Sequence, residues 1–188
     1  QRCGTVLPTA FAGAHARPLC HKQDPDARPI DAFFHESLLK SPLYAGEIPG
    51  EMADVHGGWH DAGDYGKYMP TSAAALWHLL TAYELDSKAF SDGDLGIPES
   101  GNRIPDILDE ARWELDWICR MQNANGGFYH KVTCETWFKG MPEQEEKPRY
   151  LFEMTTHDTA MATAVLALAA RIWQAYDEQA SRTFLERA

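Results

Sequence analysis

Apolar residues recur every three or four positions through most of the chain after Pro70, and this spacing is typical of amphipathic helices. It predicts a first helix over about Pro70–Leu85, with the proline in the first turn. A second helix is predicted over about Pro105–Gln122 and a third, rich in alanine, over about Asp158–Glu178. No strong alternating pattern follows residue 70, and only short extended pieces are expected near Phe128–Thr133. The sequence therefore predicts an all-α fold.

The segment before Pro70 is of a different kind. It is rich in Pro and Gly and has only short apolar runs, which indicates irregular structure. The whole chain of 188 residues is 44% hydrophobic and 24% charged, which is ordinary for a folded domain with one sizeable core. We therefore expect one unit in which an irregular segment, residues 1–69, precedes helical hairpins, residues 70–188.

Charge and hydropathy exclude several classes of partner. Against 17 Lys and Arg residues stand 28 Asp and Glu residues, and the net charge of −11 disfavours nucleic acid or an anionic membrane as a ligand. The longest apolar stretch, Ala160–Ala170, is shorter than the ~18 residues that a membrane span needs. The first residues lack the charged start and apolar run of a signal peptide. A neutral polysaccharide is compatible with this charge.

Residues 57–68 read Gly-Gly-Trp-His-Asp-Ala-Gly-Asp-Tyr-Gly-Lys-Tyr and place two carboxylates, Asp61 and Asp64, among glycines and aromatic rings. Glycine lets the backbone turn sharply, aromatic faces stack on sugars, and paired carboxylates share acid–base work or hold a water. The ligand pattern of an EF-hand calcium loop is not met from Asp61 onward. An ordinary turn followed by a helix cap is the plainer alternative for Asp-Ala-Gly-Asp alone.

The same segment closely resembles the aspartate-bearing loop of family-nine glycoside hydrolases, the inverting cellulases and their relatives. Further blocks resemble that family in the same order, namely Ile104–Trp117, Met121-Gln122 and Gly126–Val132. Several ordered blocks are far more specific than one motif. The resemblance spans roughly residues 55 to 175 and implies the N-terminal part of an (α/α)6 barrel catalytic domain. The remainder of that barrel is absent from this sequence.

The resemblance also implies a reaction, the hydrolysis of β-1,4-glucosidic bonds in cellulose or related β-glucans with inversion. Asp64 then matches the general base that activates water, and Asp61 assists it. Inversion needs base and acid about 6.5–9.5 Å apart across the scissile bond, so two residues on one tight loop do not fill both roles. The family's acid is a Glu in a region that no block here resembles. Loop residues Glu99, Glu135 and Glu153 fit a solvated role better than that of the acid.

Cys3, Cys20 and His21 form a second group, because thiolates and imidazole suit tetrahedral zinc. From spacing alone a disulfide between the two cysteines fits at least as well. A bacterial subgroup of the family holds a structural zinc with two Cys, the His after the second Cys, and a later His beside the catalytic loop. His60 matches that later position and His56 is the substitute.

Two further sets of candidates remain. His130 matches a family position that contacts the glycan, and Trp137 and Tyr65 could line the same groove. The tryptophans in the predicted helices are expected to pack in the core: Trp77, Trp113, Trp117 and Trp173. A calcium ion is a further possible cofactor, at Asp92, Asp94 and Glu99, although such acidic loops are more often hydrated.

A secreted, extracellular protein is implied, because polymeric cellulose does not enter cells. The expected partner is a β-glucan, and the rest of the catalytic domain as a second polypeptide is left open. One alternative is an exo-acting β-glucosidase or glucosaminidase of the same family, in which residues 22–56 would block the groove. The other is a non-catalytic glycan-binding or structural fragment.

Overall fold

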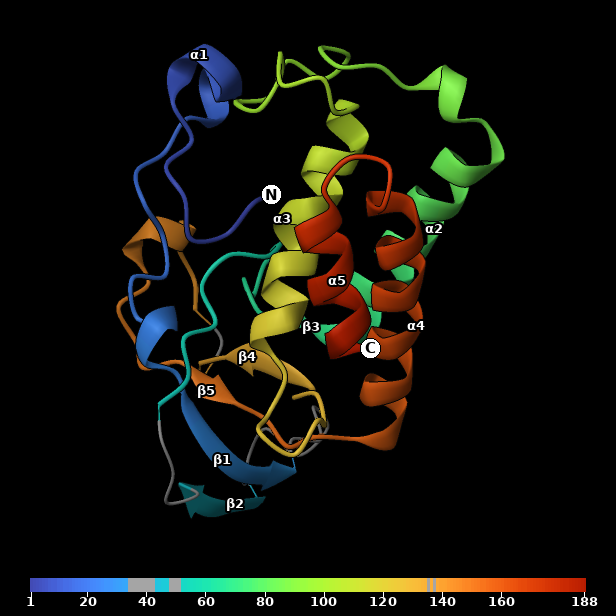
Figure 1. Ribbon diagram of the computed structural model, residues 1–188. Helices are drawn as coiled ribbons and strands as arrows, with labels where there is room; N and C mark the ends of the chain where they lie inside the picture. Colours follow the sequence, from blue (N-terminus) through green and yellow to red (C-terminus); the bar gives the residue numbers. More distant parts are fainter. Residues whose placement is uncertain (34–42, 48–51, 135, 137) are drawn as a thin grey trace.

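The computed structural model describes residues 1–33, 43–47, 52–134, 136 and 138–188. The long helices lie side by side in Figure 1: α2 (Met69–Leu85), α3 (Asp106–Arg120), α4 (Thr156–Trp173) and α5 (Glu178–Arg187). Helix α2 contacts both α3 and α4, and α4 contacts α5. The first two predicted helices are confirmed to within two residues at each end.

Shorter helical pieces occur between these elements. Helix α1 spans Thr9–Ala12, and single 3-10 turns lie at Gly13–His15, Asp24–Asp26, Ser87–Ala89 and Pro142–Gln144. None of the helices in the described part of the chain is both long and apolar enough to cross a membrane.

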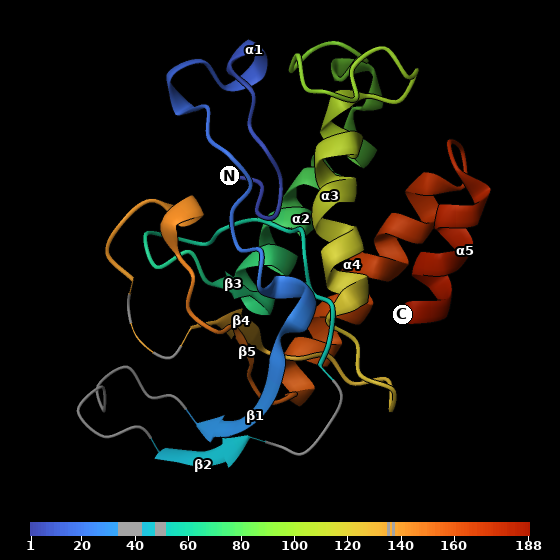
Figure 2. The same cartoon turned by 90° about the vertical axis from the view of Figure 1, so that its left-hand side faces the viewer.

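A small sheet lies beneath the helices (Figure 2) and makes the all-α prediction wrong in part. Its five strands run in the order β2-β1-β5-β4-β3, and only the β1–β5 pair is parallel. The strands are β1 (Arg28–Phe33), β2 (Leu43–Glu47), β3 (Lys67–Tyr68), β4 (Lys131–Thr133) and β5 (Tyr150–Leu151).

Strands β3 and β5 were missed because two residues each are too few to show an alternating pattern. Strands β1 and β2 fall inside the segment that was predicted to be irregular, whereas β4 confirms the extended piece near Phe128–Thr133. The β1–β5 pair joins residues far apart in sequence, with Arg28 opposite Tyr150. The sheet therefore fastens the N-terminal segment to the helical part of the chain.

The third predicted helix is two helices. Helix α4 ends at Trp173, and α5 begins after Asp177, whose side chain accepts a hydrogen bond from the Ala180 N–H. An Asp at the cap with Glu178 in the first turn is a helix start signal. The apolar spacing concealed it, because Tyr176 continues the α4 pattern through the turn.

The core lies between the helices and the sheet and includes the buried side chains of Leu80, Leu115 and Phe128. Trp117 and Trp173 are fully buried, as predicted, and Trp113 is partly buried. The prediction is wrong for Trp77, which is 47% exposed on the outer face of α2.

Gly58 brings the loop of residues 57–66 directly onto α3. Its φ is +76°, and a Cβ at this position would lie 2.7 Å from the ring of Trp117, so only glycine fits. The Trp113 indole N–H donates to the Gly58 carbonyl at 3.0 Å. The start of the loop is thereby fixed against a helix of the core.

Glu114 of α3 is a fully buried carboxyl group. Burial raises its pKa to about 8, against the opposing effects of nearby Ser72 and Lys67. A carboxyl whose pKa is raised in the folded state keeps its proton at a pH where the unfolded chain has released it.

The raised pKa of Glu114 makes the free energy of unfolding depend on pH. We expect Glu114→Gln to remove this dependence, because the amide keeps the shape of the acid and does not ionise. The stability contributed by the wild-type group is fully present below pH 4.5 and is lost as the pH rises through about 8. As the pH rises through this interval, the free energy of unfolding of the variant should therefore increase relative to that of the wild type by up to about 1.4 kcal/mol for each pH unit. Urea unfolding of the full-length protein at pH 5 and pH 8 measures the difference, and equal pH slopes in both proteins would contradict the assignment.

Candidate functional site

Residues 57–66 form a tight loop that packs against α3 at Gly58 and leads into strand β3. The Asp61 N–H donates to the Gly66 carbonyl at 2.9 Å and closes the turn. Tyr65 has a φ of +52°, a left-handed conformation that is uncommon for a residue with a side chain. The side chain of Asp61 is exposed and that of Asp64 is partly buried. The loop therefore presents the two aspartates from one short turn.

The carboxylate of Asp64 is held by two donors. The Tyr68 hydroxyl donates to Oδ2 at 2.6 Å, and the Gly66 N–H donates to Oδ1 at 3.2 Å. Tyr68 lies in strand β3, opposite Lys131 of β4. The ring of His130 meets the Tyr68 ring edge-on, with 6.4 Å between centroids. The structure thus brings His130 next to the tyrosine that orients Asp64.

His130 is oriented by a residue that the sequence analysis missed. Its Nδ1 lies 2.8 Å from Oδ2 of Asp158, a fully buried residue in the first turn of α4. Burial alone would raise the pKa of Asp158, but hydrogen bonds from His130 and Thr155 leave it below its ordinary value. An ionised Asp158 accepts the Nδ1 proton of His130 and leaves Nε2 as the nitrogen for another partner.

Of the other two substrate-binding candidates, Tyr65 and Trp137, the structure describes only Tyr65. The Tyr65 hydroxyl donates to the Gly140 carbonyl at 2.8 Å, and its ring lies 5.4 Å from that of His60. Trp137 and Glu135 lie outside the described residues. Tyr65 therefore has a ring face, rather than a hydroxyl donor, to offer a ligand.

Cys3, Cys20, His21 and His60 converge on one point, as predicted for a metal site. Their ligand atoms all lie within 4.8 Å of one another. Sγ of Cys3 is 3.2 Å from Nδ1 of His21, which is 3.1 Å from Nε2 of His60. Nε2 of His60 is 3.8 Å from Sγ of Cys20. The substitute His56 is instead hydrogen-bonded to Asp54 at 2.6 Å.

These separations suit a tetrahedral ion. Zinc bonds of about 2.0–2.3 Å place neighbouring ligand atoms roughly 3.3–3.8 Å apart, close to the distances in the cluster. Both cysteines are free thiols rather than a disulfide. Burial raises the pKa of Cys3, whereas the hydrogen bond from Cys3 lowers that of Cys20. Two sulfurs and two imidazole nitrogens in a buried cluster fit zinc.

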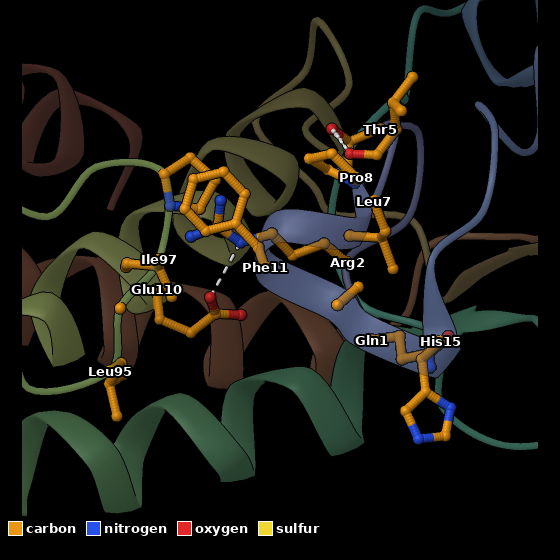
Figure 3. A pocket seen from close by; sticks show the side chains of 14 residues that line it. Gln1, Arg2, Thr5, Leu7, Pro8, Phe11, His15, Leu95, Ile97 and Glu110 are labelled. Atoms are coloured by element: carbon orange, nitrogen blue, oxygen red, sulfur yellow. Dashed lines mark hydrogen bonds and ion pairs between the residues drawn. The ribbon is translucent and has the colours of Figure 1, made fainter.

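The N-terminal segment that carries Cys3 is fastened to α3 by Arg2. This side chain donates to Glu110 at 2.9 Å and to Glu99 at 2.8 Å, and its guanidinium lies over the ring of Trp113. Figure 3 shows the Arg2–Glu110 contact at the wall of a pocket of about 380 Å³, which Phe11 also lines. Among the predicted site residues that the structure describes, none lines this pocket.

The carboxylates of the acidic loop already have donors. Asp92 and Asp94 accept hydrogen bonds from backbone N–H groups of their own loop, and Glu99 accepts one from Arg2. These contacts explain Asp92 and Asp94 as turn-forming groups and Glu99 as the ion-pair partner of Arg2. A calcium ion at this place stays an untested prediction.

Comparison with known proteins identifies the group to which this loop and cluster belong. The profile of the family described as glycosyl hydrolase family 9 matches residues 1–188. The chain belongs to this family. Family 9 membership confirms the resemblance that was drawn from the blocks between residues 55 and 175.

Curated family 9 relatives are named as glucan-degrading enzymes. Endoglucanase C of Cellulomonas fimi is 41% identical over 146 residues, which are 72% of this chain and 13% of that protein. A cellodextrinase of Butyrivibrio fibrisolvens is 34% identical over 192 residues and aligns with 100% of this chain and 31% of its own length. The chain thus spans at most about a third of these relatives.

Solved family 9 structures superpose on the whole chain. A metagenome-derived endoglucanase is 42% identical, with a TM-score of 0.82 over 100% of this chain and 32% of its own. A Zn-binding triple mutant of the endoglucanase J30 is 34% identical, with a TM-score of 0.80 over 99% of this chain and 33% of its own. The helices and the sheet are therefore part of the family 9 architecture.

Proposed function

We propose that this chain is the part of an inverting β-1,4-glucan hydrolase that carries the catalytic base. The observation that supports this most directly is the carboxylate of Asp64, oriented by Tyr68 and Gly66 beside the exposed Asp61. The relatives are named endoglucanase, cellobiosidase and cellodextrinase, which supports a β-1,4-glucan as the substrate.

In the proposed reaction Asp64 accepts a proton from the water that attacks the anomeric carbon, and Asp61 accepts a second hydrogen bond from that water. The hydrogen bond from Tyr68 to Oδ2 fixes the orientation of the Asp64 carboxylate, so that its remaining lone pairs point toward the attacking water. The free nitrogen of His130 hydrogen-bonds a sugar hydroxyl. The ring face of Tyr65 contacts the sugar, and Trp137 stays a sequence-based candidate for the same groove.

The general acid is supplied by sequence outside this chain. Asp61 and Asp64 sit on one turn, whereas inversion places the acid on the other side of the scissile bond, about 6.5–9.5 Å away. Residues 1–188 are accordingly proposed as the first part of a catalytic domain, completed by the rest of the same protein or by a second polypeptide. The site of action is extracellular, where polymeric glucan is found.

A structural zinc is proposed at Cys3, Cys20, His21 and His60. When bound, the ion would cross-link the N-terminal segment to the loop, because His60 directly precedes Asp61. It takes no part in the chemistry. The zinc site would then hold the loop before Asp61, and strand β3 holds it after Asp64, so the position of the base is fixed from both directions along the chain.

We expect Asp64→Ala to lower kcat by about 10²–10⁴-fold on a soluble β-1,4-glucan, with little change in KM, because the variant lacks the base. Added azide should restore part of the rate, since this nucleophile needs no proton removed. Reducing-sugar kinetics of the full-length protein measure both effects, with Asp86→Asn on the protein surface as the control. Glycan binding without hydrolysis by the unaltered protein would instead favour the non-catalytic alternative.

We expect one zinc ion per chain in the native protein, and less than about a tenth of that in Cys20→Ser or His60→Ala, because three ligands bind zinc far more weakly than four. Elemental analysis after gel filtration measures the content. Cys119→Ser is the matched control, since this cysteine lies in α3 and outside the cluster. A zinc-free native protein with Cys3 and Cys20 joined by a disulfide would rule the site out.

We expect His130→Ala to weaken the binding of cello-oligosaccharides by about 10-fold, which is the loss of roughly one hydrogen bond. Titration calorimetry measures the affinity. Both proteins carry Asp64→Ala, so that hydrolysis is too slow to disturb the measurement. His78→Ala is the control, because this histidine is exposed on α2. Unchanged affinity in the His130 variant would remove this residue from the binding site.

A further inference from the structure

Arg149 is a fully buried arginine that contacts the catalytic loop directly and reaches the metal-ligand cluster through Glu145. Its Nε donates to Oδ1 of Asp24 at 3.0 Å, and its Nη1 donates to Oε2 of Glu145 at 3.1 Å. Its Nη2 donates to the carbonyl oxygen of Tyr65 at 3.1 Å. Neither Arg149 nor the two carboxylates expose any side-chain surface. The planar guanidinium thus joins three segments of the chain in one arrangement.

On one side this arrangement reaches the cluster. Oε2 of Glu145 also lies 2.8 Å from Nε2 of His21, so a carboxylate orients the histidine whose Nδ1 faces the other ligands. A buried carboxylate on the outer nitrogen of a ligating histidine fixes the ring and strengthens metal binding. The same oxygen of Glu145 therefore serves both His21 and Arg149.

On the other side the arrangement holds the loop at both of its ends. The Nζ of Lys67 donates to Oδ2 of Asp24 and to the carbonyl oxygens of Val55 and Gly57, at 2.6–2.8 Å. Arg149, on the other oxygen of Asp24, holds the carbonyl of Tyr65. Tyr65 directly follows Asp64 and has a left-handed backbone, a conformation that persists only when its surroundings fix it.

We propose that Arg149 is a positioning residue through which the metal-ligand cluster, by way of Glu145, fixes the backbone of the catalytic loop at Tyr65. The inference rests on the proposed function only for its effect on turnover. Apolar side chains of similar size often make a core at least as stable as buried ion pairs do. A role in fixing the geometry of the loop therefore explains why two cations and two carboxylates are buried here.

The test is Arg149→Lys in the full-length protein. This variant keeps the positive charge and loses the planar guanidinium that donates to Asp24, Glu145 and Tyr65 at once. We expect zinc content to stay near that of the wild type, while the Tyr65 and Gly66 amides exchange hydrogen for deuterium at least about 10-fold faster. Both amides donate hydrogen bonds within the loop, to Ala62 and Asp64. On a soluble glucan, kcat should fall by about 10²-fold with KM within about 3-fold.

Arg171→Lys is the matched control, because Arg171 is an exposed arginine paired with Glu84 on the helical surface. It should change none of these readouts. If Arg149→Lys leaves the exchange of both loop amides unchanged, the inference is overturned. The exchange measurement does not need turnover, so it still decides the inference if the protein proves not to hydrolyse glucan.

Glu145→Gln carries the test if the Arg149 variant does not fold. This variant keeps the shape of the side chain and removes the charge between His21 and Arg149. We expect zinc affinity to fall by about 10–100-fold and exchange at Tyr65 and Gly66 to rise in the zinc-loaded protein. Weaker zinc binding with unchanged loop exchange would show that the cluster and the loop are independent, which overturns the inference.

Discussion

Asp24 is a buried carboxylate with a buried cation on each oxygen, and the site depends on this arrangement. Lys67 lies 2.7 Å from Oδ2 and Arg149 lies 3.0 Å from Oδ1, and no side-chain surface of the three is exposed. A single unpaired charge here would cost several kcal/mol, so each group requires the others. They come from the N-terminal segment, from β3 and from the approach to β5. Their mutual requirement therefore fixes where three distant segments meet.

The long helices could be predicted because the apolar periodicity that marks each of them is local in sequence. The apolar spacing of α2 and α3 gives each a continuous buried face, and that face is visible without knowing its partner. The sheet could not be predicted in this way. Strands β3 and β5 have two residues each, and β5 pairs with residues of β1 that lie more than a hundred positions earlier. Neither the length nor the pairing leaves a periodic signal.

The candidate site divides in the same manner. The aspartates of the loop and the Cys and His residues of the cluster could be named because they form recognisable blocks, and the structure gathers the four ligands from positions up to 57 residues apart. Asp24, Glu145, Arg149 and Asp158 could not be named. Each acts through contacts with residues distant in sequence, and only Asp158 has a local signal, as part of a helix cap. Residues that orient a site are found from its geometry rather than from motifs.

The proposed chemistry explains why so many buried polar groups surround a single loop. An inverting hydrolase needs its base and its acid at a fixed separation, and a misplacement of about 1 Å is enough to cost two orders of magnitude in rate. When the two groups lie on different segments, contacts between them cannot set that distance, so each must be fixed to its own scaffold. In this chain the loop that carries the proposed base is fixed by Gly58 on Trp117, by Lys67 at one end and by Arg149 at the other. Under the proposed function, the separation of base and acid is set by how the rest of the catalytic domain packs on this core.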